Sequence, residues 1–276
     1  MNASISASPA RPNTRVSTDT SRLWSEIIKE ARDAMRRDGT MQSYLACSIA
    51  DHSHLHVALS KRLATKLAEP SLPADALHEM FVQLLADDDV EAAVTYDLQA
   101  IVQRDAASSG VMSAFLNYKG FLALSTYRIS HQLWRAGRRS AALFLQSRVS
   151  EVWSIDIHPA AQIGSSIFID HGSGIVIGET AVIEDCVSLL HDVTLGGTGK
   201  HHGDRHPKVR KGVLIGAGAK ILGNVEIGEW ARIGAGSVVL TAVPPHCTAV
   251  GVPARIIPQP PSMTPAVEMD HSNWVI

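Results

Sequence analysis

Residues 163–195 read IGSSIFIDHGSGIVIGETAVIEDCVSLLHDVTL, and residues 215–239 read IGAGAKILGNVEIGEWARIGAGSVV. Apart from two breaks, an aliphatic residue returns at every sixth position, and glycine often follows it directly. A period of six fits neither an amphipathic helix nor an alternating strand; it is typical of a parallel β-helix built from hexapeptides. The recurring aliphatic residues are Ile163, Ile169, Ile177, Ile183, Leu189, Leu195, Ile215, Ile221, Ile227, Ile233 and Val239.

Each hexapeptide is expected to form one flat side of a triangular prism, so that three of them complete a coil. The aliphatic side chain points into the narrow core, and the glycine after it lets the chain turn without a Cβ clash. A small or branched residue stands four positions after each aliphatic one, as at Ala181, Val187 and Val193. These positions predict a β-helical C-terminal half.

The rhythm breaks at two places, and breaks in a repeat scaffold often carry function. Two extra residues lie between the hexapeptides of Ile169 and Ile177, next to Asp170 and His171. A longer segment, GGTGKHHGDRHPKVRKGVL at residues 196–214, precedes the hexapeptide of Ile215. We expect this whole segment to loop out of the prism and to act as a binding element.

Composition and charge place few demands on the function. The chain has 276 residues, a formal net charge of −2 and 19% charged residues, and no apolar run approaches the ~20 residues of a transmembrane helix. We therefore expect no nucleic-acid partner and no membrane partner. Three widely spaced cysteines, Cys47, Cys186 and Cys247, favour reduced thiols and a cytoplasmic protein.

Helical and β-helical patterns divide the chain into four parts. Residues 1–20 are rich in Ser, Thr, Pro and Asn and are expected to be disordered, although Arg11 and Arg15, with no acid before Asp19, also fit an organelle transit peptide. Residues 21–152 show helical periodicity, and residues 153–257 carry the hexapeptides. Residues 258–276 are expected to form a flexible tail. The predicted fold class is α+β.

Eight further segments are informative together: QRDAA (103–107), KGFLALSTYRISHQLW (119–134), DIHPAAQIG (156–164), IDHGSG (169–174), VIGETAVI (176–183), VTLGGTGK (193–200), GDRHPKVRKGVLIGAGAKILGN (203–224) and GVPARII (251–257). They resemble the serine O-acetyltransferase family, and the resemblance covers residues 21–257. It implies a left-handed β-helix that transfers an acetyl group from acetyl-CoA to L-serine, giving O-acetyl-L-serine for L-cysteine biosynthesis.

Acetylation of a serine hydroxyl needs a base, and histidine serves near neutral pH. A lone histidine at a coil corner also occurs in purely structural roles, but His171 stands beside the first break. Asp156 lies close to one coil earlier and can hold the imidazole ring, as a carboxylate does in a catalytic dyad. The resemblance assigns His171 as the general base and Asp156 as its partner.

His191 occupies the same hexapeptide position as His171, three hexapeptides later. The two residues should therefore stack on one face of the prism, with backbones roughly 5 Å apart. Stacked histidines can be two arms of a zinc site. His191 can equally be a polar neighbour of the active site with no metal role.

Serine is a zwitterion, so its site needs a cation for the carboxylate and acids for the ammonium group. The resemblance assigns Arg205, His206, Asp105 and Asp170 to substrate contact. Asp105 follows a predicted helix, where a negative charge is unfavourable with the helix dipole. It can alternatively cap the next segment.

Acetyl-CoA is the expected co-substrate, and no permanently bound cofactor or metal is expected. Its pantetheine arm can extend along the coils past Ala217 and Ala235, while Lys220 and Arg232 meet its phosphates. The resemblance places the backbone amide of Gly197 near the thioester. The glycines of this segment alone are a weak phosphate-binding signal, because no helix follows them.

The resemblance also implies partners and assembly. Enzymes of this kind are trimers, with sites between neighbouring prisms, and two trimers pair into a hexamer. L-Cysteine is the expected feedback inhibitor, competing with L-serine. The C-terminal Ile276 is expected to enter the active site of O-acetylserine sulfhydrylase, although the last residues also read as a frayed terminus.

Other functions remain open from the residues alone. The hexapeptide pattern also occurs in other acyltransferases and in a class of zinc carbonic anhydrase, which would use His171 and His191 as metal ligands. The GDRHPK segment argues against the anhydrase. A scaffold for a partner enzyme would need neither His171 nor Arg205.

Overall fold

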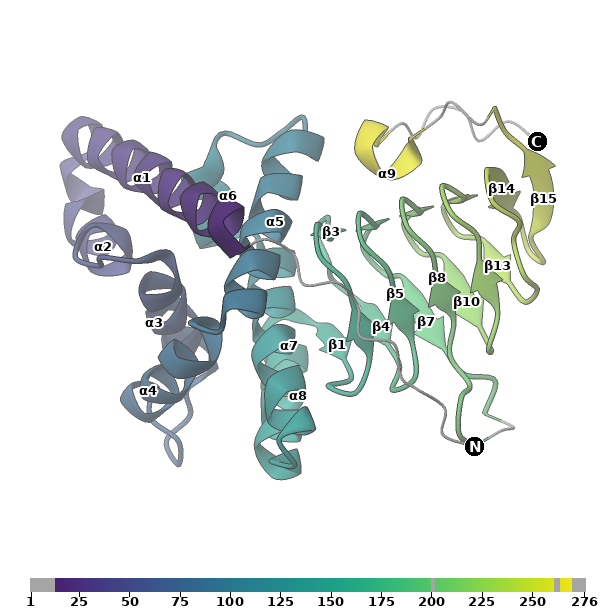
Figure 1. The fold of residues 1–276 in the computed structure, drawn as a ribbon, viewed down its shortest axis with the longest axis horizontal. Coiled ribbons are helices and arrows are strands. Elements are labelled where there is room, and N and C mark those ends of the chain that lie inside the picture. The colour runs from purple at the N-terminus through teal and green to yellow at the C-terminus, as the bar shows by residue number, and fades with distance from the viewer. Residues whose placement is uncertain (1–12, 200–201, 261–263, 270–276) are drawn as a thin grey trace.

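The chain folds into a helical N-terminal half followed by a three-sided prism of short strands (Figure 1). The computed structural model describes residues 13–199, 202–260 and 264–269. None of the helices in these ranges is long and apolar enough to cross a membrane. The helices are α1 Asn13–Arg37, α2 Gln42–Leu45, α3 Leu55–Leu67, α4 Ala74–Leu85, α5 Asp88–Arg104, α6 Val111–Asn117, α7 Lys119–Arg135, α8 Arg139–Trp153 and α9 Pro265–Glu268, with a 3₁₀ turn at Gly39–Met41 and a π-helical stretch at Ala46–Ala50.

The first helix begins earlier than the composition suggested. α1 starts at Asn13, and Thr20 is buried with its hydroxyl 2.8 Å from Thr95 Oγ1. The prediction of disorder is therefore wrong for residues 13–20, because α1 packs against α5 and gains contacts that composition does not reveal. Residues 1–12, with their proposed transit-peptide character, lie outside the described residues.

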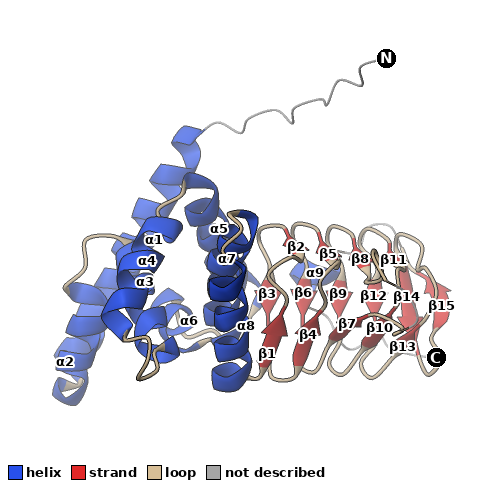
Figure 2. Ribbon diagram, turned by 90° about the horizontal axis from the view of Figure 1, so that it is seen from below, coloured by secondary structure: helices blue, strands red, loops and turns tan. Residues whose placement is uncertain are grey.

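Three sheets form the sides of the prism, and Figure 2 shows their strands stacked away from the helices. Sheet I contains β1, β4, β7, β10 and β13, sheet II contains β2, β5, β8 and β11, and sheet III contains β3, β6, β9, β12, β14 and β15. The strands are β1 Ile155–Ile157, β2 Gln162–Ile163, β3 Phe168–Ile169, β4 Ile175–Ile177, β5 Val182–Ile183, β6 Ser188–Leu189, β7 Thr194–Gly196, β8 Lys208–Val209, β9 Leu214–Ile215, β10 Lys220–Leu222, β11 Glu226–Ile227, β12 Arg232–Ile233, β13 Val238–Val239, β14 Cys247–Val250 and β15 Arg255–Pro258.

The register confirms the parallel hexapeptide coil. Val176 pairs with Thr194, eighteen residues later, and Ile177 pairs with Leu195. Ile177, Leu195 and Ile221 are almost completely buried, as inward residues should be, whereas Ile163 in the first coil is only partly buried. The pairing is parallel throughout except between β14 and β15, which form an antiparallel hairpin at the far end. Side chains that alternate between core and outer face follow from this geometry.

The long break is shorter than the sequence suggested. Lys208 and Val209 form β8, which pairs with both β5 and β11, and Val209 is fully buried. The prediction that all of residues 196–214 loop out is therefore wrong. Val209 and Val213 keep the aliphatic spacing of a hexapeptide, and the backbone N–H of Val182 already donates to the carbonyl oxygen of Pro207.

A buried ion pair fastens the helical half to the first coil. Arg128 on α7 donates from Nε to Asp97 on α5 at 2.8 Å, and from its Nη2 to the carbonyl oxygen of Gly164 at 2.8 Å. The second oxygen of Asp97 accepts the backbone N–H of Ile167 at 2.9 Å. Because both charges are almost fully buried, removing either one would leave the other unpaired in the interior.

The segment after the prism is not simply a free tail. α9 packs against α5, with Pro265 and Ala266 buried. The hydroxyl of Ser188 donates to the carbonyl oxygen of Ala266 at 2.8 Å. The prediction of a flexible tail is therefore wrong for residues 265–268, because apolar contacts and this hydrogen bond hold them. Residues 270–276, including Ile276, lie outside the described residues.

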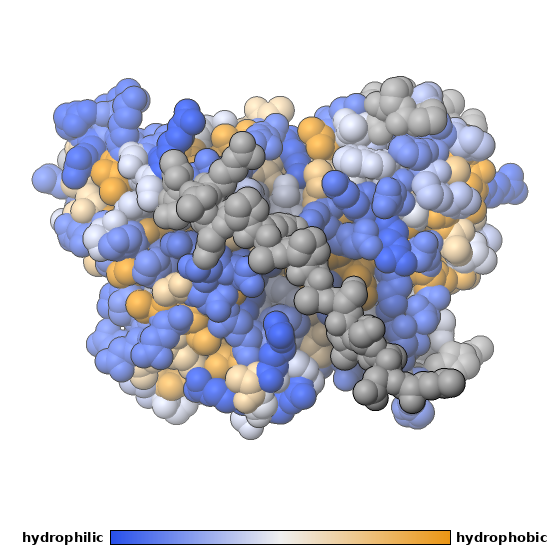
Figure 3. All heavy atoms as spheres, in the orientation of Figure 1, coloured by the Kyte–Doolittle hydropathy of each residue, from blue (hydrophilic) through white to orange (hydrophobic). Residues whose placement is uncertain are grey.

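The surface is mainly polar. In Figure 3 hydrophobic residues are scattered over the helical half and gather near the β13–β15 end of the prism. Exposed apolar side chains there include Leu240, 52% exposed, and Val252, 72% exposed. Val176 on the outer face of sheet I is also 39% exposed. These residues leave part of the prism surface apolar.

Candidate active site

One corner of the prism carries a column of predicted site residues. Ile169, Leu189, Ile215 and Ile233 stand in register across sheet III. Two residues beyond each of them lie His171, His191, Ala217 and Ala235. The column therefore brings together the predicted base and two of the predicted acetyl-CoA contacts, one residue per coil.

His171 is presented outward at this corner. Its backbone has φ of 56°, in the left-handed region that the tight turn requires, and its side chain is 75% exposed. Its Nε2 lies 3.8 Å from Asp170 Oδ1. The rings of His171 and His191 are 5.9 Å apart and nearly perpendicular. The prediction that the two residues lie at equivalent positions on neighbouring coils is confirmed, and their rings meet edge to face. Nowhere in the described ranges do three or more His, Cys, Asp or Glu residues form a metal-binding group.

A cavity of about 500 Å³ opens beside His171. Asp105 and Asp170 line it, and the start of α7 forms another wall. Burial raises the pKa of Asp170, and the nearby charge of Asp105 raises it further, while His171 opposes the shift. Gly120 is required here, since a Cβ at this position would lie 2.2 Å from the carbonyl oxygen of Ile169. The cavity is small and acidic, as the ammonium group of an amino acid requires.

Asp105 caps the next segment, which is one of the two roles expected of it, and it also lines the cavity. Its Oδ1 accepts the backbone N–H of Ala107 at 2.8 Å, so it does cap the next segment. Its Oδ2 accepts the hydroxyl of Tyr118 at 2.6 Å on the cavity wall. Burial, with this hydrogen bond, raises the pKa of Tyr118 to about 12. Tyr118 therefore stays a neutral donor and fixes one oxygen of Asp105.

Asp156 lies in β1 and does not touch His171 in this structure. Its Oδ1 accepts a hydrogen bond from Gln146 Nε2 at 2.6 Å. Both Asp156 and His171 are described residues, and no ion pair within 4.0 Å joins them. The structure places Asp156 on the first strand of sheet I, paired with Val176 on β4, the strand that follows His171. The dyad stays a prediction.

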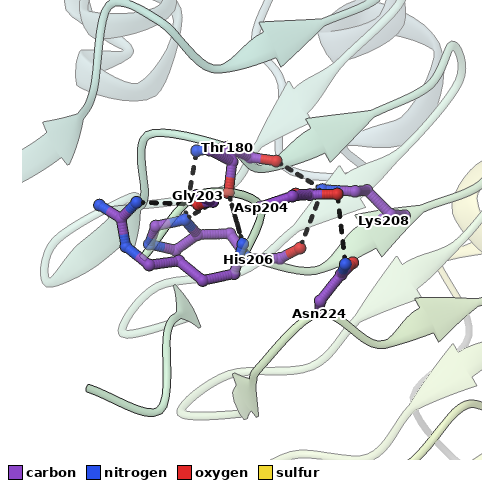
Figure 4. A network of polar contacts seen from close by, with 7 residues as sticks. Thr180, Gly203, Asp204, His206, Lys208 and Asn224 are labelled. Carbon is purple, nitrogen blue, oxygen red and sulfur yellow. Dashed lines mark hydrogen bonds and ion pairs between the residues drawn. The ribbon is translucent and has the colours of Figure 1, made fainter. Parts of the chain in front are cut away.

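A second corner carries the other predicted substrate residues. The loop between β7 and β8 returns along the corner that follows β4, where Arg205 Nη2 lies 2.7 Å from Glu179 Oε2. His206 Nδ1 accepts the backbone N–H of Thr180 at 3.2 Å. Figure 4 shows Thr180, His206, Asp204 and Lys208 in one network. Lys208 Nζ donates to the carbonyl oxygen of Thr180 at 2.7 Å.

His206 is almost completely buried against the coil. Its ring occupies the space in which a Cβ on Gly178 would stand, 2.0 Å from the ring atoms. Burial lowers the pKa of His206, and the neighbouring Arg205 lowers it further. The imidazole is therefore neutral near pH 7 and can accept the Thr180 N–H.

The two corners lie at opposite ends of β4. His171 precedes this strand and Glu179, which holds Arg205, follows it. Between them the chain makes a turn with positive φ at His171, Gly172 and Gly174 and then runs through β4. The two groups therefore lie on different corners of the coil within this chain.

The remaining acetyl-CoA residues are distributed unevenly. Lys220 Nζ is held by Asp192 Oδ1 at 2.8 Å beside the His171 column, and Gly197 packs against Arg205 on the loop. Arg232 is fully buried in sheet III. In this structure its guanidinium is not presented to solvent, so it does not join the other predicted phosphate contacts.

Sequence reasoning missed Tyr118, Glu179 and Thr180. Each contacts a predicted site residue, but only through pairings between distant segments. Glu179 and Thr180 lie within the quoted segment at 176–183, and Tyr118 directly precedes the quoted segment at 119–134. Their position beside these segments is the one signal that could have marked them.

Comparisons with known proteins agree along the chain. Residues 23–126 match the family model described as "Serine acetyltransferase, N-terminal", and residues 206–241 match "Bacterial transferase hexapeptide (six repeats)". A serine acetyltransferase of Salmonella typhimurium is 52% identical over 255 residues, which cover 92% of this chain and 93% of the relative.

Solved structures of related chains have the same fold. A serine acetyltransferase in complex with cysteine has a TM-score of 0.88 at 48% identity, covering 91% of this chain and 98% of that one. A soybean serine acetyltransferase complexed with serine has a TM-score of 0.85 at 50% identity, covering 87% and 99%. One from Brucella abortus in complex with coenzyme A has a TM-score of 0.85 at 48% identity, covering 86% and 96%.

These relatives span both the helical half and the prism, at about half of all positions identical, and the N-terminal family model matches the helical half. The chain belongs to the serine acetyltransferase family.

Proposed function

We propose that this protein transfers the acetyl group of acetyl-CoA to the hydroxyl of L-serine, giving O-acetyl-L-serine and CoA in the first step of L-cysteine biosynthesis. The observation that carries the proposal is the exposed His171 beside an acid-lined cavity of about 500 Å³. Related chains that bind serine and coenzyme A support the choice of substrates.

The reaction begins with the serine ammonium group between Asp105 and Asp170. His171 removes the hydroxyl proton as the oxygen attacks the thioester carbon. The C–S bond then breaks, and the CoA thiolate takes the proton back from the imidazolium. Serine attacks directly, so no covalent acyl-enzyme forms.

Asp156 acts as the partner of His171 in this scheme. Its carboxylate orients the imidazole and stabilises the imidazolium. The dyad requires His171 to turn from Asp170 toward Asp156 when substrate binds. The 75% exposure of the His171 side chain leaves room for that rotation.

Arg205 and His206 bind the serine carboxylate from a neighbouring copy of the chain. The supporting argument is geometric, since these residues and His171 lie at opposite ends of β4. In a closed ring, each copy can supply its Arg205 corner to the His171 corner of the next copy, so that every site is complete. We propose a trimer of this kind, paired with a second trimer through the helical halves.

Acetyl-CoA runs along the His171 column. The pantetheine arm lies along the corner turns at Ala217 and Ala235. The amide of Gly197, which lies beside Arg205, meets the thioester oxygen from the same neighbouring copy that supplies Arg205. Lys220 binds a phosphate in exchange for Asp192. Arg232 can take part only if the residues that cover it move.

Thiol release from acetyl-CoA, measured with and without L-serine, tests the function. We expect release that depends on L-serine and produces O-acetyl-L-serine in equal amount. Transfer to a different hydroxyl or amino acceptor would identify another acyltransferase. Hydration of CO₂ after zinc loading would favour the carbonic anhydrase.

Two further properties belong to the proposal. L-Cysteine should inhibit in competition with L-serine, because the two differ in one atom and a related chain binds cysteine. The protein should work in the cytoplasm and bind O-acetylserine sulfhydrylase through Ile276. Cysteine found only outside the Arg205 and His206 site would contradict the first of these.

A further inference from the structure

Gln146 on α8 reaches across the junction between the helical half and the prism. Its Nε2 donates a hydrogen bond to Asp156 Oδ1 at 2.6 Å, and both side chains are half-buried. α8 packs against β1, at the end of the prism that adjoins the helices (Figure 2). A helical side chain thus holds the carboxylate that would serve His171.

Local structure explains why the two side chains meet. Leu145 and Val149 belong to the buried stripe of α8, and Gln146 lies at its edge. Ser154, with φ of 57°, ends the helix and reverses the chain into β1. Asp156 lies between buried residues of that strand, so it points away from the prism core and toward the helix.

The chemistry of the bond restricts what Gln146 can do. A carboxamide NH₂ only donates, so it pairs with the ionised carboxylate and occupies one of its two oxygens. The other oxygen remains available to accept an imidazole N–H. Within the described ranges, no second hydrogen-bond donor is recorded for this carboxyl group.

We propose that Gln146 is a positioning residue for acetyl transfer, fixing Asp156 so that its free oxygen meets His171. The proposal rests on the His171–Asp156 dyad of the proposed function. Gln146 touches neither substrate, and it acts only through Asp156. Its removal should therefore lower turnover without weakening substrate binding.

The variants Gln146→Leu and Gln146→Glu test this role in the full-length protein. We expect kcat to fall about tenfold in Gln146→Leu, as for lost outer hydrogen bonds at other sites, with the KM values for L-serine and acetyl-CoA within about twofold of wild type. Gln146→Glu keeps the size but places two carboxylates together, and kcat should fall at least as far. In an Asp156→Asn background, Gln146→Leu should cause no further loss.

Gln132→Leu is the matched control. Gln132 is also half-buried and donates from Nε2 to a backbone oxygen, that of Leu84, at 3.1 Å. Loss of this hydrogen bond affects only contacts within the helical half, so kcat should not change. Thermal unfolding of all variants identifies any that fail to fold. Gln146→Glu is isosteric with the wild-type residue, so it still tests the proposal if Gln146→Leu does not fold.

The outcomes separate the two levels of the argument. If Asp156→Asn keeps near-normal turnover, the dyad and the role of Gln146 fall together. If Asp156→Asn is impaired while both Gln146 variants turn over normally, the dyad stands and the role of Gln146 is overturned. A higher KM with unchanged kcat in the Gln146 variants would show that Gln146 is only a structural contact. An equal loss of kcat in Gln132→Leu would lead to the same conclusion.

Discussion

His171 and His191 meet edge to face on neighbouring coils, with ring centroids 5.9 Å apart and planes at 79°. The contact exists because hexapeptide register stacks equivalent positions one above another. It places the exposed imidazole of His171 beside a second imidazole and at the head of the column that leads to Ala217 and Ala235. The two rings mark where serine and acetyl-CoA should meet.

His171→Ala should abolish most turnover while leaving the fold intact. Removal of a general base typically costs about 10²–10⁴-fold in rate, and an exposed corner residue contributes little to packing. Steady-state kinetics with L-serine, alongside thermal unfolding, measure both effects. Turnover near the wild-type rate in a folded variant would remove His171 from the mechanism.

Mixing two inactive variants should restore activity if each site forms between copies. The His171→Ala chain keeps the corner of Arg205 and His206 intact. The Arg205→Ala chain keeps the corner of His171 intact. Random mixing within a ring leaves about a quarter of the sites with both intact corners. Co-expression followed by assay at low L-serine measures the recovery.

The control for this experiment replaces Arg205→Ala with the double variant His171→Ala/Arg205→Ala. No combination of these chains contains both intact corners, so no activity should return. The absence of recovery in the test mixture would place the complete site within one chain. Recovery in the control would show instead that activity does not require His171.

Stability should fall as the pH drops below about 6.5. Burial lowers the pKa of His206 below its usual value of 6.5, so the unfolded chain takes up a proton before the folded one does. The contribution of the neutral His206 imidazole to folding stability is present above about pH 6.5 and is lost on acidification. Burial also lowers the pKa values of His131 and His158, and it is the main cause in both cases.

Thermal unfolding between about pH 7.5 and 5.5 measures this dependence. His206→Gln should unfold at lower temperature at neutral pH and show a weaker response to acid. An unfolding temperature that rises on acidification would contradict the sign.

Asp97→Ala should destabilise the junction strongly. The variant leaves Arg128, 7% exposed, without its ion partner, and breaking a buried pair costs about 3–5 kcal/mol. The matched control is Asp75→Ala, since Asp75 is 90% exposed and pairs with Lys61 at 3.2 Å. Its loss should cost less than about 1 kcal/mol. Denaturant unfolding compares the two, and equal losses would contradict the buried pair's role.

Deletion of Ile276 should abolish sulfhydrylase binding and leave acetyl transfer unchanged. A free C-terminal carboxylate can be captured by a ring of backbone amides, and the isoleucine side chain can fill an apolar slot. Calorimetry with intact and truncated chains measures binding, and a peptide of the last ten residues should inhibit the sulfhydrylase. Equal binding by both chains would dispose of this contact.

Much of the prism could be predicted from the sequence because its contacts are repetitive. A period of six places each aliphatic residue in the core and stacks His171 on His191. The same period could have predicted β8, because Val209 and Val213 have the aliphatic spacing of a hexapeptide. The loop glycines and basic residues on both sides concealed it.

The site was predicted less completely. The quoted motifs include Asp105, Asp170 and His171, which the fold brings to one cavity. They do not reveal Tyr118 against Asp105, or Gln146 against Asp156. Tyr118 and Asp105 stand at the ends of two helices, and Gln146 and Asp156 lie on a helix and a strand. Each pair meets only when these elements pack, and no local sequence pattern predicts such a contact.

The sequence by itself determined the coil, its inward residues and the corners at which function is placed, because hexapeptide geometry is local and repeats. Only the tertiary structure decided that Arg205 lies across β4 from His171, that α9 returns to α5, and that Arg232 is buried. Those outcomes depend on how separate elements pack, and packing energy is shared among residues far apart in the chain.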